Sequence, residues 1–241
     1  MRNGRSVSAL ACLGCMLAVA TARPCGAAVR KTYDASQGTL PDAQGFELFD
    51  DGGSPAYTIQ DGALHQGLTN WDGKQKWMSQ DTPIDFEVGA VMETELKIIY
   101  SSVSTSGGYR IAGWDMSITD SDGRCFVVYI GSEEIFLWNE PELYPQRITF
   151  DSTDDFHHYR LVIADGAGSL FIDGDSNPSL TLPVGPTWHS LPNTGQFGDI
   201  TYHGQSESLL RSFSYINVPE PASLCLLALG GWAVVKCRRK M

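Results

Sequence analysis

The sequence predicts an all-β protein in which an antiparallel β-sandwich lies between an N-terminal signal peptide and a C-terminal transmembrane helix. Three observations support this prediction. The middle of the chain alternates apolar and polar residues with a period of two, and amphipathic helical periods are missing there. Turns rich in Gly and Asp separate these short runs. Each end of the chain combines an apolar run with basic residues, which divides the chain into residues 1–28, 29–217 and 218–241.

The first segment is typical of a secretory signal peptide. Arg2 and Arg5 give it a positive start, an apolar run covers residues 7–20, and small residues follow. Residues 1–28 are therefore expected to be removed on export.

The cleavage site decides which cysteines remain. Cleavage after Ala28 is preferred, and it would leave Cys125 as a single thiol that we expect to be buried and inert. Cleavage after Ala22 is also open, and it would retain Cys25 and allow a Cys25–Cys125 disulfide.

Period-two alternation predicts the strands in order. Residues 92–100 alternate apolar with charged side chains, as in a strand with one buried and one wet face. The pattern recurs at 112–118 and 159–163, whereas 126–130 is apolar on both faces and is typical of a central strand. The residues expected in the core are Leu96, Ile98, Trp114, Val128, Leu161 and Leu170.

Turn residues separate these strands. Residues 120–123, 164–166 and 173–174 combine Asp with Gly, which tolerate the unusual dihedral angles of tight turns. Four prolines in 175–194 predict a long irregular crossing between strands.

The charge of the body excludes some partners. The chain carries a formal net charge of −11, and its two ends carry +3 each, so residues 29–217 carry −17. Such a surface repels phosphate backbones and anionic lipid headgroups, which argues against nucleic-acid binding. No cofactor is indicated, although acidic side chains suit divalent cations and calcium stays open.

The C-terminal segment has three parts in a fixed order. A Pro-Glu-Pro tripeptide follows Val218, an apolar run covers 222–235, and a basic cluster covers 236–240. This order resembles the PEP-CTERM sorting signal that exosortases process. The corresponding residues are Pro219, Glu220, Pro221, Arg238 and Arg239.

This resemblance implies a cellular location for the protein. The chain would be exported by a Gram-negative-type bacterium and held in the inner membrane by the C-terminal helix, with the basic cluster in the cytoplasm. An exosortase would then recognise the tripeptide, and the protein would reach the cell surface or extracellular matrix. A plain C-terminal anchor is the alternative.

A second resemblance rests on the hairpin expected over 156–174. It opens with Phe156-His157 and closes with Asp173-Gly174, as the central hairpin of laminin-G-like, concanavalin A-like domains does. The resemblance implies a jelly roll whose last strand, expected at 209–217, runs beside the first. This fold carries lectins, glycanases and adhesive modules, so it does not by itself give a function.

A glycanase of this fold would place two carboxylates on one strand face, in the pattern Glu-x-Asp-x-x-Glu. The nearest stretch is 133–140, where Phe136 stands in the place of the middle Asp. Glu134, Phe136 and Trp138 are expected to share a face, which supplies one carboxylate without a partner. No catalytic residue is assigned, and the chain is predicted not to be an enzyme.

The acidic residues and the histidines are the candidate metal ligands of the chain. His157 and His158 are neighbours on a strand and point to opposite faces, so they are not expected to bind one ion. An Asp173-x-Asp175 pattern begins like a calcium loop but lacks its Gly and closing Glu. Calcium stays open at this turn and at Asp120 with Asp122.

Tryptophan rings offer the remaining candidate ligand site. Trp71 and Trp77, in a polar segment, and Trp188, in the irregular crossing, are the candidates for exposed rings that stack on sugars. Neutral polysaccharide is the expected partner because no basic patch exists to attract anionic sugars. The leading hypothesis is an exported, non-catalytic carbohydrate-binding module, and the alternatives are a glycan hydrolase and a purely structural surface protein.

Overall fold

The computed structural model describes residues 29–51, 57–67, 74–102, 113–139, 146–199 and 205–217. They fall in one compact unit, Val29–Val218. The predicted signal peptide and the predicted C-terminal transmembrane helix lie outside the described residues. Within those residues, no helix is both long enough and apolar enough to cross a membrane.

Fifteen strands in the described ranges form two antiparallel sheets, here called sheet A and sheet B. The strands of sheet A are β1 (Arg30–Asp34), β3 (Tyr57–Gln60), β4 (Ala63–Gln66), β6 (Ala90–Ser101), β11 (His157–Ala164), β12 (Ala167–Ile172), β13 (Leu180–Pro183) and β15 (Ser206–Asn217). The strands of sheet B are β2 (Glu47–Asp51), β5 (Lys74–Ser79), β7 (Trp114–Thr119), β8 (Cys125–Ile130), β9 (Glu134–Trp138), β10 (Gln146–Thr149) and β14 (Thr194–Asp199).

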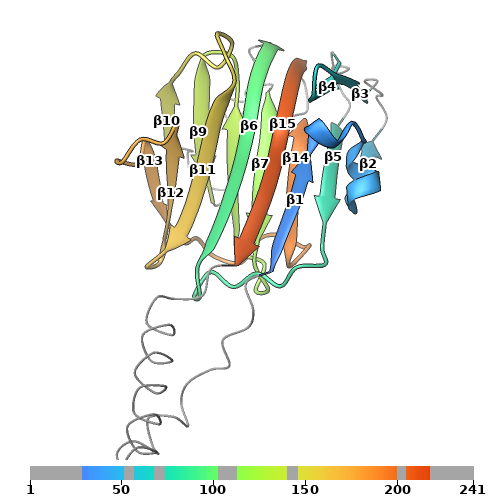
Figure 1. The fold of residues 1–241 in the computed structure, drawn as a ribbon. Coiled ribbons are helices and arrows are strands. Elements are labelled where there is room, and N and C mark those ends of the chain that lie inside the picture. Colours follow the sequence, from blue (N-terminus) through green and yellow to red (C-terminus); the bar gives the residue numbers. More distant parts are fainter. Residues whose placement is uncertain are drawn as a thin grey trace, which may run out of the picture. The chain divides into compact units, whose positions relative to one another are not determined.

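The two sheets pack face to face, which confirms the predicted all-β sandwich (Figure 1). Sheet A has the order β13-β12-β11-β6-β15-β4-β3, with β1 also beside β15. Sheet B has the order β10-β9-β8-β7-β14-β5-β2. Consecutive strands such as β7 to β10 lie beside one another, and other neighbours, such as β6 with β15 and β7 with β14, come from distant parts of the chain, as in a jelly roll.

The long strands β6 and β15 run side by side at the centre of sheet A (Figure 1). Register shifts after Glu207 and after Leu210 mark irregularities in this pairing. The other edge of β15 is shared by β1 and β4, with Ser212 opposite Asp34 and Leu210 opposite Leu64. The last strand therefore runs beside the first, as the resemblance implied.

Two short 3-10 helices, η1 (Ala35–Gln37) and η2 (Pro41–Gln44), join β1 to β2. Asp34 caps the first, because its side chain accepts a hydrogen bond from the Ser36 backbone N–H at 2.9 Å. The second ends at Gly45, whose φ of 81° favours a residue without a side chain. These helices turn the chain from sheet A into sheet B.

The core fills the space between the sheets. The six residues predicted there are all fully buried at 0% exposure, namely Leu96, Ile98, Trp114, Val128, Leu161 and Leu170. Aromatic rings form its centre: Phe197 stacks at 5.8 Å on both Tyr33 and Trp114, and its centroid lies 4.6 Å from that of Phe213.

The predicted strands at 92–100, 126–130 and 159–163 are confirmed, and one expectation needs correction. The strand expected at 112–118 is confirmed from Trp114 onward, and residue 112 lies outside the described residues. The alternating segment at 92–100 lies within β6, and the run at 126–130 lies in β8, between β7 and β9 in the interior of sheet B. The crossing expected over 175–194 is not irregular throughout, because Leu180–Pro183 forms β13 at the edge of sheet A. An edge strand tolerates the proline there, since one side of the strand makes no ladder hydrogen bonds.

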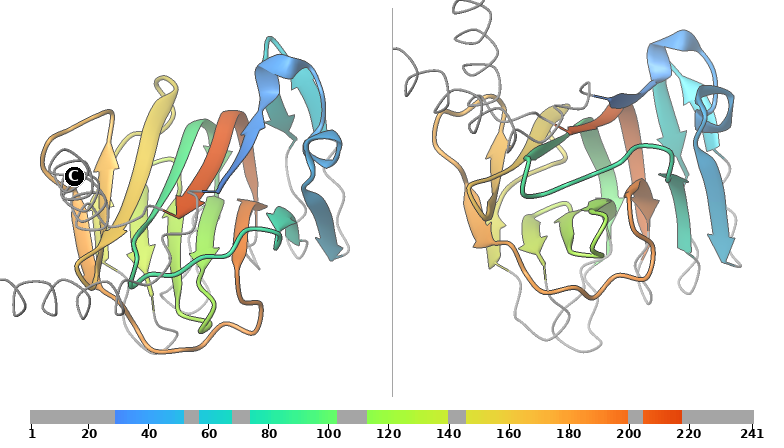
Figure 2. Two further views of the ribbon diagram at one scale, coloured as in Figure 1. Left: turned by 60° about the horizontal axis from the view of Figure 1, so that its bottom comes forward. Right: turned by 90° about the horizontal axis from the view of Figure 1, so that it is seen from below.

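The rest of that crossing, residues 184–193, runs along one end of the sandwich to reach β14 (Figure 2). It is fixed to the β7–β8 turn by backbone hydrogen bonds. Trp188 and His189 donate to the Gly123 carbonyl at 3.1 and 3.0 Å, and Asn193 donates to the Asp120 carbonyl at 3.1 Å. These hydrogen bonds hold residues 184–193 beside the turn that joins β7 to β8.

Candidate functional site on the outer face of sheet B

The alternation of side chains gives sheet B a second face, directed away from the core. On β7, β8 and β9, Met116, Val128 and Leu137 pair with one another and point into the core. Their neighbours in sequence therefore point the other way. We call this the outer face of sheet B, and most of its side chains are buried. It comprises Asp115, Ser117, Thr119, Cys125, Val127, Tyr129, Glu134, Phe136, Trp138 and Gln196.

A row of buried polar side chains crosses this face on β7 and β14. Asp115 and Ser117 are 0% exposed, and Gln196, opposite Ser117, is 2% exposed. The Gln196 Nε2 donates a hydrogen bond to the Ser117 hydroxyl. The Gln196 Oε1 is buried and has no hydrogen-bond partner within the described part of the chain. A buried acceptor in this state fits a donor from a ligand or an ordered water.

Three aromatic rings form a cluster beside that row. Trp138 lies 6.3 Å from Tyr129 and 5.5 Å from Trp188, measured between ring centroids. All three are half-buried, so part of each ring remains accessible. The Trp188 Nε1 is buried without a hydrogen-bond partner among the described residues. The aromatic cluster of Tyr129, Trp138 and Trp188 thus combines ring faces with an unused donor.

The three tryptophans predicted as exposed rings have different outcomes. Trp188 is half-buried and belongs to the aromatic cluster. The prediction that Trp77 is exposed was wrong. Its side chain is 3% exposed, points into the core opposite Phe197, and contacts the Tyr57 ring edge-on at a centroid distance of 5.4 Å. Trp71 lies outside the described residues.

Sequence reasoning missed Trp138 as a ligand-binding candidate, although the signal was present. Glu134, Phe136 and Trp138 share one face, as predicted, because Ile135 and Leu137 fill the core side of β9. That face is the outer face of sheet B. Glu140, the last residue of the stretch that was compared with the glycanase pattern, lies outside the described residues.

Strands β7 to β9 place two carboxylates on this face, Asp115 and Glu134. Phe136 pairs with Tyr129, which pairs with Asp115, so Glu134 is two strands and two residues away from Asp115. With strands ~4.8 Å apart and a rise of ~3.4 Å per residue, their Cα atoms are separated by about 12 Å. This Cα separation does not fix the distance between the two carboxyl groups, and no catalytic residue is assigned.

The residues considered as metal ligands are engaged in the fold. Asp120 accepts hydrogen bonds from the Asp122 and Arg124 backbone N–H groups and from the Arg124 guanidinium. Asp173 accepts one from the His158 N–H at 2.9 Å and contacts the His157 ring at 2.7 Å. In the ranges that the structure covers, no group of three His, Cys, Asp or Glu side chains is arranged to hold a metal ion.

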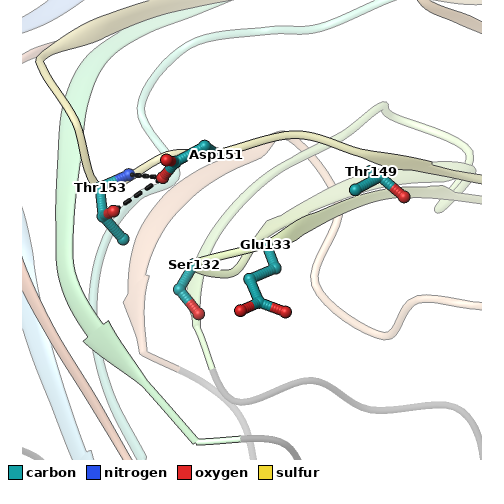
Figure 3. Close-up of a pocket in the computed structure, with 5 residues that line it drawn as sticks. All are labelled: Ser132, Glu133, Thr149, Asp151 and Thr153. Atoms are coloured by element: carbon teal, nitrogen blue, oxygen red, sulfur yellow. Dashed lines mark hydrogen bonds between the residues drawn. The ribbon is translucent and has the colours of Figure 1, made fainter.

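A separate polar pocket of about 280 Å³ opens near the ends of β9 and β10. Figure 3 shows its lining, in which Asp151 accepts hydrogen bonds from the backbone N–H and the hydroxyl of Thr153. The lining residues are Ser132, Glu133, Thr149, Asp151 and Thr153. Because none of them is aromatic, this pocket offers no ring for a sugar to stack on, and the aromatic cluster is the stronger candidate site.

Cys125 is a buried thiol, as predicted. It is 2% exposed on the outer face of sheet B, and burial raises the pKa of the thiol to about 12. The thiolate is therefore negligible at neutral pH, and the side chain acts as a small apolar residue.

Comparison with known proteins extends both resemblances. Residues 217–240 match the PEP-CTERM protein-sorting motif. A carbohydrate esterase from the Shiga toxin-encoding bacteriophage phi24B is 14% identical, with a TM-score of 0.55 over 78% of this chain and 97% of that one. A β-1,3-1,4-glucanase (lichenase) derived from a mouse hindgut metagenome is 12% identical, with a TM-score of 0.52 over 80% of this chain and 100% of that one.

A non-enzymatic domain is similar to the same degree. The binding domain of botulinum neurotoxin DC, solved in complex with SialylT, is 12% identical, with a TM-score of 0.50 over 83% of this chain and 50% of that one. A comparison with curated proteins gives no match. At such identities the similarity shows the fold alone, which is that of the concanavalin A-like β-sandwiches.

The sorting motif indicates where the protein is sent in the cell. The chain is an exported, exosortase-sorted cell-surface protein whose body is a concanavalin A-like β-sandwich.

Proposed function

We propose that the sandwich is a non-catalytic carbohydrate-binding module whose ligand lies on the outer face of sheet B. The observation that supports this most is the aromatic cluster of Tyr129, Trp138 and Trp188 beside the buried polar row. A sugar ring presents an apolar face bordered by hydroxyl groups. The aromatic rings can stack on the apolar face of the sugar. The Gln196 Oε1 and the Trp188 Nε1, which have no hydrogen-bond partner among the described residues, can bond with its hydroxyl groups.

Neutral polysaccharide is the ligand class that the charge favours. The body carries −17, and the outer face includes the buried carboxylate of Asp115. An acidic polysaccharide would meet repulsion over this surface, unless calcium bridged the two. Neutral sugars meet no such penalty.

We propose further that the apolar run at 222–235 holds the protein in the inner membrane until an exosortase acts at the Pro-Glu-Pro tripeptide. The sorted protein then displays its sandwich on the cell surface or in the extracellular matrix. A carbohydrate-binding face would there attach the cell to polysaccharide or retain polysaccharide at its surface.

Binding rather than hydrolysis is proposed because a glycan hydrolase needs two suitably placed carboxyl groups around the scissile bond. The stretch of this chain nearest to the glycanase pattern has Phe136 in the place of the middle Asp. A release of reducing ends from polysaccharide that is lost in Asp115→Asn would contradict the proposal and favour a hydrolase.

The experiment begins with a glycan array of the full-length protein purified in detergent, with and without calcium, followed by binding isotherms with the best neutral glycan. Trp138→Ala and Trp188→Ala are expected to weaken binding by about fivefold or more, since a stacked ring contributes about 1 kcal/mol or more. The matched control is Tyr100→Ala, which removes a 46% exposed ring on β6 of sheet A and is expected to leave affinity unchanged.

Thermal melts separate binding from folding. A variant that keeps its melting temperature and loses affinity supports the aromatic cluster as the site. If all three variants bind equally, or if Tyr100→Ala weakens binding as much as Trp138→Ala does, the outer face of sheet B is not the glycan site.

A further inference from the structure

The described sandwich has five free strand edges, those of β1, β3 and β13 in sheet A and of β2 and β10 in sheet B. Four of them lack exposed large apolar side chains. A free edge exposes unpaired backbone N–H and C=O groups to which another chain can add. In sheet B, β10 carries the exposed Arg147, whose side chain lies 4.0 Å from Glu134. In sheet A, β13 ends in Pro183 and β1 carries Arg30 and Lys31, which oppose strand addition. Strand β3 is only four residues long, and its Tyr57 and Ile59 pack against the core.

The fifth edge, β2, differs because it exposes two large apolar side chains. Leu48 is 44% exposed and Phe49 is 43% exposed, and the large exposed apolar side chains of the other described strands, Ile99 and Tyr100, lie on the central strand β6. Neither Pro nor Lys occurs in the sequence of β2, Glu-Leu-Phe-Asp-Asp. Natural proteins use these residues and other charged side chains to block edges, and the charges of β2 are all acidic.

The two apolar side chains lie on opposite faces of that edge. Leu48 pairs with the core-facing Trp77, so it continues the core side of sheet B. Phe49 pairs with Lys76, whose Nζ lies 5.2 Å from the Phe49 ring centroid, so it continues the outer face. A strand added at this edge would cover both side chains at once and pair with the free backbone groups.

The charge of β2 indicates which strand would add. Its sequence has a formal charge of −3 within a body of −17. Two copies paired antiparallel through Leu48 and Phe49 would bring the acidic ends of the strand against each other, and like charges directly opposite destabilise a pair of strands. A strand with basic residues at both ends and apolar residues between them would match the charge and the apolar pair together.

We propose that β2 is a docking edge for an extended, basic segment of a partner protein, which joins sheet B as an additional strand. The occupant has apolar side chains at its centre and Lys or Arg on both sides. Backbone hydrogen bonds of the new ladder supply affinity, and the flanking charges supply selectivity. The docking edge is independent of the proposed glycan site.

The test uses the full-length protein in detergent and a fluorescent peptide of sequence Lys-Lys-Val-Leu-Val-Lys-Lys, followed by anisotropy. The peptide is expected to bind. A version of the peptide that is N-methylated at its three apolar residues keeps its charge and its apolar side chains. It loses the backbone N–H groups that would donate hydrogen bonds to β2, so it is expected to bind about tenfold more weakly or worse. Leu48→Lys is expected to weaken binding by a similar factor, and Phe49→Thr provides a second variant without added charge.

The matched control is Ile99→Lys, which makes the same change of charge at a 42% exposed residue of the central strand β6. It is expected to change affinity less than about threefold. Equal loss in Leu48→Lys and Ile99→Lys, or equal binding of the N-methylated peptide, would show simple charge attraction and overturn the proposal. A peptide-free dimer in sedimentation that Leu48→Lys converts to monomer would show that a second copy occupies the edge instead.

Discussion

At the scale of single residues, His157 joins three segments of the chain. Its Nδ1 lies 2.7 Å from the Asp173 Oδ2, and its Nε2 lies 2.7 Å from the Asp154 Oδ1. The Phe150 ring packs edge-on against the imidazole at 4.8 Å. A neutral imidazole has a single N–H, so both contacts are hydrogen bonds to carboxylates only when the ring carries two protons. The aromatic-His start of the hairpin is therefore an ionic clamp.

The clamp predicts a pH dependence of stability. Burial lowers the pKa of His157, but the hydrogen bonds and charges of Asp173 and Asp154 outweigh it, and the net pKa is raised above its usual value. The stabilisation is fully present below the unfolded pKa of about 6.5 and is lost as pH rises through the folded pKa. His157→Gln is expected to lower the free energy of unfolding by about 1 kcal/mol in mild acid, and by less in alkali.

Urea unfolding of the wild type and the variant across this pH range measures the difference. His158→Gln is the control, because His158 is the exposed neighbour on the same strand and points to the other side. A difference between wild type and His157→Gln that stays constant with pH would show that the ring acts through packing and not through its charge.

At the scale of strands, the absence of a side chain lets the two sheets approach at one point. Gly168 of β12 faces Phe126 of β8, and a Cβ added there would lie 2.6 Å from the Phe126 ring. Gly168→Ala is expected to destabilise the protein by about 1–3 kcal/mol, because a well-packed core resists an added methyl group. Thermal melts measure the loss.

The double variant Gly168→Ala with Phe126→Leu provides the check on that explanation. Removing the ring makes room for the added methyl group, so the two substitutions together should cost less than the sum of their separate effects. Additive losses would mean that Gly168 is needed for another reason, such as the backbone of the β11–β12 hairpin.

The strands also show how far the sequence predicts this fold. Long strands with a charged wet face, such as 92–100, and the Asp-Gly hairpin turns were predicted correctly, because period-two alternation and turn chemistry are local properties. Strand β5 was not predicted, since its inward side chains are Gln75, Trp77 and Ser79, two of them polar. Inward polar residues hide the alternation, and Trp77 was therefore predicted as exposed.

At the scale of the whole molecule, pairing between distant strands decides the candidate site. The outer face of sheet B joins β7, β8 and β9 to β14, and the crossing at 184–193 adds Trp188. No local pattern predicts that Gln196 lies opposite Ser117, or that Trp188 meets Trp138. The sequence could name the residue types of the proposed sugar site and one of its rings, but the assembly depends on contacts far apart in the chain.

The C-terminal segment predicts the cellular location of the protein. Replacing Pro219, Glu220 and Pro221 by alanine is expected to leave membrane insertion intact, since the apolar run is unchanged, but to block release of the sandwich to the cell surface. Replacing Arg238 and Arg239 by glutamine is expected to weaken the C-terminal orientation instead, because retained positive charge sets topology. Cell fractionation and mass spectrometry of the mature C-terminus distinguish the two effects.

A mature wild-type protein that still ends at Met241, together with an alanine variant in the same location, would show that the C-terminal segment is a plain membrane anchor. An exosortase substrate should instead end near the tripeptide, and only the alanine variant should retain the basic tail.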